Sequence, residues 1–389
     1  MKSAKDLMPC DGPTHRHYRI VHISSAHPVT DSRIFQKQCK TLAASGFEVI
    51  LIACDSKTIY DKQVRIVTYR RCVNRLGRML YATLPVLKLA IREDGDLYHL
   101  HDPELLITGQ LLRLFKKKVV FDMHENLPKA LLTKYWIPSH LRVFISTLFK
   151  CIQRVLLQRV YIIFAEKSYS EEYNWARDSE VVLNMPLVEH LNSVQATKYA
   201  VTTIGYLGAI SEGRGLLSMV DAVRTVRNVG FDVQCIIIGA DNNNLKGLIE
   251  NSLRDNGVWG YVNLLGYLPG PHAWQHIAKC HIGFALLKRE PNYVQSYPTK
   301  IFEYMALGIP VVASNFPLYR SVIEKYRCGI CVDPDDIEEI SSAIIKLISK
   351  PDLAESMGRA GKAAVKRYFN WENEKGKLIA FYDKVLSSR

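Results

Sequence analysis

The sequence lacks any long hydrophobic run. No apolar stretch in its 389 residues approaches the roughly 18 to 20 residues that span a membrane. Residues 1–17 are polar, without the apolar core of a signal peptide. We therefore expect a cytoplasmic protein with a flexible N-terminus at 1–17. With 48% hydrophobic residues, a chain of this length can bury the cores of two domains of ordinary size.

Cysteine spacings typical of disulfides or zinc sites are also missing. The nine cysteines are odd in number and scattered, as expected in a reducing compartment. Cys328 and Cys331 form a single CxxC, but no second ligand pair accompanies it and its neighbours have a strand-like pattern. We therefore expect no disulfide framework, and no zinc or redox chemistry at this pair.

Acidic residues are absent from two stretches of a chain whose formal net charge is +13. Eight lysines and arginines lie from Lys62 to Arg92, and six lie from Asn126 to Ala165, without one acid in either stretch. No nucleic-acid recognition motif accompanies them, and no basic run is interleaved with stacking aromatics. A nucleic-acid partner is therefore not expected.

The second stretch contains a basic amphipathic pattern within 139–160. Polar and basic residues recur at helical spacing opposite apolar ones. The polar set is Arg142, Ser146, Lys150, Gln153 and Arg154, and the apolar set is Leu141, Phe144, Ile145, Leu148, Phe149 and Ile152. Such a helix either packs its apolar face on the core, with the basic face in solvent, or docks on an anionic membrane surface.

Strand and helix signals alternate along the chain, which predicts parallel sheets covered by helices. The predicted strands are 18–24, 47–53, 64–69, 96–100, 118–123 and 160–165, then 202–208, 231–239, 262–266, 281–287, 310–314 and 328–332. A polar, unpatterned linker at 187–200 separates the two series. We expect an α/β fold of two Rossmann-like domains, 18–190 and 200–365, with ligands in the cleft between them.

The stretch from Gln295 to Ser314 carries the most specific chemistry. It predicts a short helix from Thr299 to Leu307, ended by Gly308 and followed by a buried strand. The free amides of the helix start and Lys300 form an anion site, and Glu303 can accept hydrogen bonds from two ribose hydroxyls. A helix, a glycine and a Val-rich strand also occur in doubly wound proteins that bind no nucleotide.

These residues resemble the C-terminal signature of family 4 of the retaining glycosyltransferases, also described as glycosyl transferases group 1. In that signature two glutamates eight positions apart precede the same helix and strand. Glu303 matches the second glutamate, whereas Gln295 stands at the first. The resemblance covers most of the chain from about Tyr18, and implies donor-binding roles for Gly208, Arg214, Gln295, Thr299, Lys300, Ile301 and Glu303.

The resemblance also implies the GT-B fold, in which the last helix crosses back to the first domain. The segment 366–389 looks like that crossing helix, with Trp371 as its anchor. Helical periodicity alone predicts only a terminal helix there.

Sugar transfer from a nucleoside diphosphate needs cations that stabilise the departing diphosphate. In the loop Gly205–Gly215 the family usually carries an arginine directly after the glycine and a lysine before the next helix. Here Ala209 and Arg214 occupy these places. We expect Arg214 and Lys300 to be the catalytic cations, the alternative for Arg214 being a plain surface charge.

Polar residues end two strands of the first domain. His99, His101 and Asp102 end one, and Asp122, His124 and Glu125 end the next. They show no recognisable metal-ligand spacing, and the GT-B fold generally works without a metal, so we expect none. His124 matches the cleft histidine that the family places near the sugar and is the third predicted catalytic residue, with His101, Asp102 and Glu125 as further cleft or acceptor contacts.

The first loop differs from many relatives, which have a glycine pair there. His27, Asp31 and Arg33 precede or begin a helix that runs to Ala44. They serve either as a helix cap with its salt partner, or as acceptor or diphosphate contacts.

The leading hypothesis is a retaining, metal-independent transferase of a hexose or hexosamine, without a cofactor. Its donor is a nucleoside diphosphate sugar, with a UDP-sugar favoured over a GDP-sugar, and its acceptor is a glycan or lipid-linked molecule in cell-surface polysaccharide or glycolipid assembly. Gln295 and Ala209 motivate an alternative, a non-catalytic sugar-nucleotide-binding subunit of a transferase complex. An epimerase or phosphorylase of the same fold is a third hypothesis.

Overall fold

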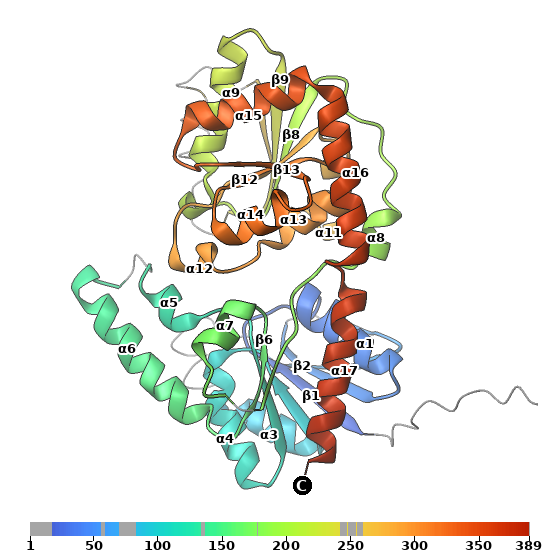
Figure 1. Cartoon of the computed structure of the whole chain (residues 1–389). Helices are drawn as coiled ribbons and strands as arrows, with labels where there is room; N and C mark the ends of the chain where they lie inside the picture. The colour runs from blue at the N-terminus through green and yellow to red at the C-terminus, as the bar shows by residue number, and fades with distance from the viewer. Residues whose placement is uncertain are drawn as a thin grey trace, which may run out of the picture.

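The computed structural model describes residues 18–388, except 56–58, 70–82, 134–136, 177 and, apart from Gly247 and Arg254, 242–259. The described residues form two parallel sheets, one in each lobe of the molecule (Figure 1). The predicted N-terminal segment 1–17 lies outside them.

The strand order of the first sheet is β3-β2-β1-β4-β5-β6-β7, and that of the second is β10-β9-β8-β11-β12-β13. The strands of the first sheet are β1 (Arg19–Ser24), β2 (Glu48–Cys54), β3 (Val64–Tyr69), β4 (Leu97–Leu100), β5 (Lys118–Met123), β6 (Tyr161–Phe164) and β7 (Ser179–Val181). Those of the second are β8 (Thr202–Leu207), β9 (Val233–Ile238), β10 (Val262–Gly266), β11 (Ile282–Ala285), β12 (Val311–Ser314) and β13 (Gly329–Val332).

Helices cover the sheets. In the first lobe they are η1 (Ser32–Cys39), α1 (Lys40–Ala44), α3 (Thr83–Glu93), η2 (Pro103–Leu105), α4 (Leu106–Leu114), α5 (Leu127–Leu131), α6 (Ser139–Leu156) and α7 (Lys167–Glu172). They continue with α8 (Val188–Asn192), η3 (Glu212–Arg214), α9 (Leu216–Asn228), α11 (Gly270–Ala278), α12 (Pro291–Val294), α13 (Thr299–Ala306), α14 (Pro317–Ile323), α15 (Ile337–Ser349), α16 (Pro351–Arg367) and α17 (Trp371–Ser387).

The predicted α/β fold is confirmed. Every predicted strand is present within a residue or two, whereas the three-residue strand β7 was missed because so short a segment has no readable alternation. The predicted linker contains the short helix α8, and the domain boundaries themselves stay a prediction. In each sheet the first strand lies between neighbours reached in opposite directions, which is the switch point where such folds bind ligands.

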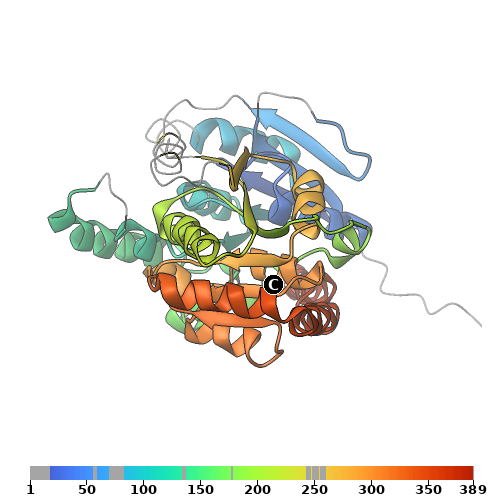
Figure 2. The ribbon, with the colours of Figure 1, turned by 90° about the horizontal axis from the view of Figure 1, so that it is seen from above.

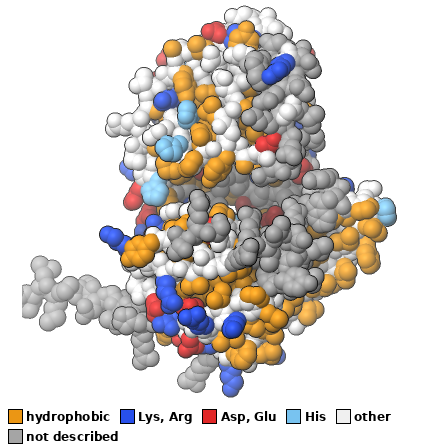
Figure 3. All heavy atoms as spheres, turned by 180° about the vertical axis from the view of Figure 1, so that it is seen from behind, with side chains coloured by type: hydrophobic (Ala, Val, Ile, Leu, Met, Phe, Trp, Pro, Cys, Tyr) orange, Lys and Arg blue, Asp and Glu red, His pale blue; other side chains and the backbone are white. Residues whose placement is uncertain are grey.

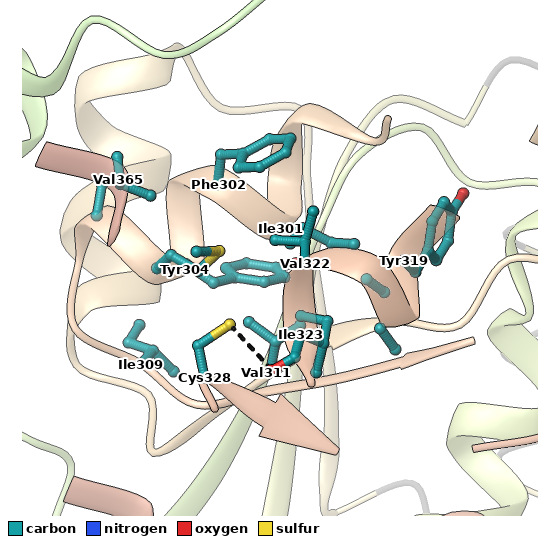
Figure 4. Close-up of a cluster of buried hydrophobic side chains, with 14 of the residues drawn as sticks. Ile301, Phe302, Tyr304, Ile309, Val311, Tyr319, Val322, Ile323, Cys328 and Val365 are labelled. Atoms are coloured by element: carbon teal, nitrogen blue, oxygen red, sulfur yellow. Dashed lines mark hydrogen bonds between the residues drawn. The ribbon is translucent and has the colours of Figure 1, made fainter. Parts of the chain in front are cut away.

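Helix α13 is held by its apolar face. Ile301 and Tyr304 are buried and lie toward Val322, Ile323 and Val311 in Figure 4. Phe302 is buried on another side of the helix, with its ring 4.9 Å from that of Phe369. The Tyr304 hydroxyl donates to the Phe284 carbonyl at 3.1 Å and accepts from the Leu207 amide at 2.9 Å. These contacts fix the rotation of the helix, so its remaining residues face a defined direction.

The crossing helix is confirmed. In Figure 1, α16 runs along the second lobe and α17 continues along the first. Trp371 is buried, and its indole nitrogen donates to the Thr41 hydroxyl at 2.8 Å. The Glu374 carboxylate accepts from the Leu183 amide at 2.9 Å. These two hydrogen bonds attach the last helix to the first domain.

The orientation of helix α6 differs from the expectation that its apolar face packs on the core. Ser146 and Gln153 are buried, where the Ser146 hydroxyl donates to the Pro128 carbonyl and Gln153 accepts from Tyr173. The apolar side faces outward and is exposed at Leu141, Val143, Phe144, Leu148, Ile152 and Val155. Of the predicted apolar face only Ile145 and Phe149 are half-buried, so the expectation that this face packs on the core is wrong for Leu141, Phe144, Leu148 and Ile152.

Figures 1 and 2 show α6 projecting from the first lobe, and hydrophobic side chains gather over this part of the molecule in Figure 3. Among the described helices, none has the length and apolar content to cross a bilayer.

The C-terminal end of α17 is attached to the first domain by hydrogen bonds from Lys118, and this attachment can be tested. The Lys118 ammonium donates to the carbonyls of Val385, Leu386 and Ser388 at 2.9, 2.7 and 2.6 Å. Lys118→Met removes these bonds at the negative end of the helix dipole, and we expect a loss of about 1–3 kcal/mol in chemical denaturation. The exposed Lys384→Met should change stability by less than about 0.5 kcal/mol. Equal losses in the two variants would contradict this role.

Candidate active site

A cavity of about 580 Å³ lies between the two domains. Residues of the first domain that line it include His27, Asp31, Arg33, His124, Glu125 and Glu166, and those of the second include Arg214, Tyr293, Thr299 and Lys300. Predicted residues of both sheets thus meet in one cavity, as the switch points of the two sheets require.

Arg214 and Lys300 converge beside Gly208. A Cβ at Gly208 would lie 3.0 Å from the Lys300 ammonium and 3.1 Å from an Arg214 nitrogen, and the glycine has a φ of +142°. A side chain at this position would crowd both cations, and L-residues rarely adopt this φ, so glycine is favoured here.

Lys300 is a buried cation without a hydrogen-bond partner among the residues that the structure describes. Its side chain is buried, and its Nζ atom lies 3.9 Å from the centre of the Tyr206 ring. Burial and the neighbouring Arg214 hold the pKa of Lys300 well below its ordinary value. The N-terminus of α13 adds amides without a side-chain cap. An anion in this corner would satisfy all of these groups.

Arg214 ends η3, directly before Gly215, which has a φ of +69°. A Cβ at Gly215 would overlap the Leu286 carbonyl oxygen, so the loop can turn this closely only at a glycine. Hydrogen bonds with the Tyr206 and Tyr293 side chains help to raise the pKa of Arg214 against the effect of burial. The residue lines the cavity, so a surface charge remote from the site is wrong.

Glu303 lies one turn into α13, partly buried, and is not among the residues that line the cavity. Burial raises its pKa, opposed by the charges of Lys37 and Lys300 and by a hydrogen bond from Trp274. Lys37 comes from the first domain and donates to Asn184 at 2.7 Å. The predicted ribose contact of Glu303 stays a prediction.

Gln295 contacts the first domain. Its side-chain oxygen accepts from the Lys129 ammonium at 2.6 Å, and its carbonyl accepts from the Ser168 hydroxyl at 2.7 Å. Where the family signature has a glutamate, this chain has an amide that bridges the domains. Its predicted sugar contact also stays a prediction. The predicted donor-binding role of Ile301, which is buried in the core, stays a prediction as well.

Asp122 organises the first-domain side of the site. It accepts from Arg33 at 2.9 and 2.7 Å, from Gln38 at 2.6 Å and from His124 at 2.9 Å. Burial raises its pKa, but Arg33 and His124 outweigh this effect and hold the pKa well below the ordinary range. Arg33 is therefore the ion-pair partner of a buried carboxylate, although it also lines the cavity.

Asp31 caps η1, because its carboxylate accepts from the amides of Arg33 and Ile34 at 2.9 Å. The helix-cap interpretation is confirmed, while its contact with an acceptor stays a prediction. His27 lies between Asp31 and Asp102, and these carboxylates raise its pKa despite burial.

His101 and Asp102 were predicted to face the cleft, and this is wrong. Both are buried behind it, because their polar atoms are used within the domain. Asp102 accepts from the Ser24 hydroxyl and the Ser25 amide at 2.9 and 2.6 Å, and His101 contacts His22 and His124. Glu125, in contrast, lines the cavity.

Two sets of side chains in the described ranges lie close enough to share an ion, His22, His99 and His101, and His101, Asp122 and His124. Hydrogen bonds already join His22 to His101, His101 to His124 and His124 to Asp122, and Arg33 pairs with Asp122. A cation there would displace these contacts and lie beside a guanidinium. A metal-free site stays our prediction.

Glu166 is a site residue that the sequence analysis missed. It directly follows the predicted strand 160–165, and an acid at the carboxyl end of a strand was a signal that could have found it. Its carboxyl accepts from the Tyr297 amide at 3.1 Å, across the two domains. Burial raises its pKa to about 8.

Glu166 predicts a pH dependence of stability. Its folded pKa of about 8 exceeds the ordinary value of 4.5, so the folded state retains a proton that the unfolded state has lost, and stability falls as pH rises between these values. Glu166→Gln keeps an acceptor oxygen and removes the ionisation. Relative to this variant, the wild type should lose on the order of 3 kcal/mol between about pH 5 and about pH 9 in urea denaturation. Glu166→Ala should lose stability at every pH, and parallel wild-type and Gln profiles would contradict the prediction.

Family models match both halves of the chain. "Glycosyltransferase Family 4" matches residues 32–173, and "Glycosyl transferases group 1" matches residues 194–364. Each match therefore falls on one of the two sheets and the helices around it.

Similar proteins agree with these matches. The chain is 25% identical over 330 residues to a phosphatidyl-myo-inositol mannosyltransferase of Mycobacterium leprae, covering 83% of this chain and 82% of that protein. Sucrose-phosphate synthase of Thermosynechococcus elongatus shares the fold with a TM-score of 0.77 at 14% identity, over 96% of this chain and all of that one.

HepE of Anabaena, solved in complex with UDP-glucose, has a TM-score of 0.72 at 14% identity, over 95% of this chain and 100% of that chain. Two matched halves, two facing α/β domains and a C-terminal helix that returns to the first domain lead to one conclusion: the protein belongs to the GT4-type glycosyltransferases of the GT-B fold.

Proposed function

We propose that the protein is a retaining hexosyl- or hexosaminyltransferase that uses a nucleoside diphosphate sugar and a lipid-linked or glycan acceptor. The observation that carries the proposal is the corner formed by Arg214, Lys300 and Gly208, where two cations and the start of α13 face one cavity. A diphosphate has the charge and the acceptor oxygens that this corner lacks.

In the proposed reaction, the bond between the anomeric carbon and the diphosphate oxygen breaks and negative charge collects on the diphosphate. Arg214, Lys300 and the α13 amides stabilise that charge more than they stabilise the bound donor. The departing oxygen takes the proton of the acceptor hydroxyl while the acceptor oxygen bonds to the anomeric carbon on the same face. No protein nucleophile is then needed, and the configuration is retained.

His124 is proposed to contact the sugar from the first domain. It lines the cavity, and its Nε2 atom contacts Asp122 at 2.9 Å, which orients the ring. A uridine nucleotide is favoured over a guanosine nucleotide, in keeping with the fold neighbour HepE that was solved with UDP-glucose. No metal is assigned, since the cations of the corner supply the charge.

The acceptor is proposed to be reached at the cytoplasmic face of an anionic membrane. The relative from Mycobacterium leprae is named for a phosphatidyl-myo-inositol acceptor. On this chain, Val143 and Phe144 of α6 are 67% and 65% exposed, while Lys150 and Arg154 supply positive charge nearby. An outward apolar row with basic neighbours suits the interface of anionic lipids.

The anion site can be tested with two variants. Arg214→Ala should lower turnover roughly a hundredfold, because it removes charge stabilisation in the transition state. Lys300→Met should leave the free protein at least as stable as the wild type, because it removes a buried amine without a partner, yet abolish stabilisation by UDP in a thermal-shift assay. Transfer assays with lipid extracts and thermal shifts with UDP and GDP measure both effects.

Arg320→Ala is the matched control, since Arg320 is an exposed cation of the same domain paired with Glu324. Wild-type turnover in Arg214→Ala would remove this residue from the mechanism. Nucleotide binding without transfer to any acceptor would instead favour a non-catalytic subunit, and altered or free sugar without an acceptor would favour an epimerase or phosphorylase.

Membrane docking has its own test. Phe144→Ser with Leu148→Ser should reduce binding to vesicles containing anionic lipid by at least about tenfold, because two apolar side chains no longer enter the interface. Leu217→Ser, which changes a leucine that is 51% exposed on the second domain, should bind normally. Vesicle flotation with and without salt measures the effect. Binding that is independent of both lipid charge and the α6 substitutions would contradict membrane docking through α6.

A further inference from the structure

Three buried histidines and one tyrosine form a continuous polar chain behind the cavity. The His99 Nδ1 atom contacts the Tyr382 hydroxyl, which lies 3.4 Å from His22 Nε2. His22 Nδ1 lies 2.9 Å from His101 Nε2. His101 Nδ1 lies 3.2 Å from His124 Nε2 and 3.5 Å from an Asp122 oxygen. The chain therefore runs from the crossing helix α17 to the residue that lines the cavity.

Each of the three inner rings carries one proton. Burial lowers the pKa of His22 and His99 well below the ordinary value and that of His101 to about 3, so all three are neutral near neutral pH. A neutral imidazole has one N–H donor and one bare acceptor nitrogen. From His99 through Tyr382 and His22 to His101, each contact needs one donor and one acceptor, so the tautomers of the three rings are coupled and this part donates in a single direction.

The two ends of the chain favour one direction. At one end, the Asp122 carboxylate can only accept hydrogen bonds. At the other end, His99 Nε2 is buried and has no partner among the described residues. A bare acceptor nitrogen there leaves no N–H unpaired, whereas the opposite direction would bury an N–H without an acceptor, which is rarer and more costly. The favoured chain therefore donates from His99 toward Asp122, where the N–H groups of His101 Nδ1 and His124 Nε2 both face the same carboxylate oxygen, at 3.5 and 2.9 Å.

We propose that Tyr382 of the crossing helix is a positioning residue, which holds His22, His99 and His101 in their Nδ1–H tautomers and thereby fixes the orientation of His124. With His124 Nε2 turned toward Asp122 and His101, Nδ1 is the one remaining ring nitrogen for a ligand in the cavity. The crossing helix thus acts on the cleft through hydrogen bonds as well as through packing. The expected effect on turnover rests on the proposed transfer reaction. The tautomer assignment does not depend on that reaction.

The direction of the chain is tested without any assay of activity. Long-range proton–nitrogen correlation spectra of the full chain labelled with ¹⁵N-histidine separate Nδ1–H from Nε2–H tautomers, and single His→Gln variants assign the signals. We expect His22, His99 and His101 to be neutral Nδ1–H tautomers. An Nε2–H tautomer in any of the three, or a charged ring, overturns the proposed direction.

The positioning role is tested with Tyr382→Phe, which removes the hydroxyl and keeps the ring. Tyr161→Phe is the matched control. The Tyr161 hydroxyl contacts Ser388 at the end of the same helix and takes no part in the hydrogen bonds of the histidines. We expect Tyr382→Phe to change the signals of His22, His99 and His124 and to lower kcat at least tenfold with an unchanged KM for the donor, and Tyr161→Phe to change neither.

Unchanged His124 signals in a folded Tyr382→Phe protein overturn the positioning role. Should that variant not fold, the same comparison is made with His22→Gln, which interrupts the chain next to Tyr382. Altered tautomers in a protein that transfers no sugar would uphold the chain and contradict the proposed transferase function.

Discussion

The buried ammonium of Lys300 is the constraint on which the arrangement of the second domain depends. It lies at the start of α13 beside a second cation, Arg214, and no described residue offers it a hydrogen-bond acceptor. The helix tolerates it because Ile301, Phe302 and Tyr304 anchor the opposite side in the core. In the free protein the burial of this unpaired group lowers the free energy of unfolding, and a bound anion would remove that penalty. A preorganised site favours its ligand in this way.

The first domain contributes a buried ion pair on its side of the cavity. Asp122 uses Arg33 as its counter-ion, so neither charge is left unpaired beside the anion site. Polar contacts join the described parts of the two domains at the cavity, where Lys129 donates to Gln295 and the Tyr297 amide donates to Glu166. Helix α17 supplies the larger apolar contact through Trp371 and Tyr382. Polar contacts that can open therefore surround the cavity, while a packed helix keeps the domains together.

Gln295 shows how one substitution changes the division of roles. A glutamate at this place would form an ion pair with Lys129, whereas the amide accepts a single hydrogen bond from it. A neutral side chain holds the domains less tightly and leaves Lys129 to pair with Glu172 at 2.7 Å. The departure from the family signature is therefore compatible with a cleft that opens and closes around a donor.

The sequence by itself determined the order of strands and helices and the place of Lys300 at the start of α13, because these follow from periodicity and glycine positions. The return of the last helix to the first domain was implied by the family resemblance, since periodicity alone predicts only a terminal helix. Only the tertiary structure decided which side chains reach the cavity. His101 and Asp102 end their strand as predicted but are buried by partners distant in sequence, and Glu166 reaches the cavity from a position without a motif. Periodicity likewise predicted helix α6 but not which of its faces packs on the domain, because either face of such a helix can do so. The hydrogen bonds of Ser146 and Gln153 with other segments hold the polar face against the domain.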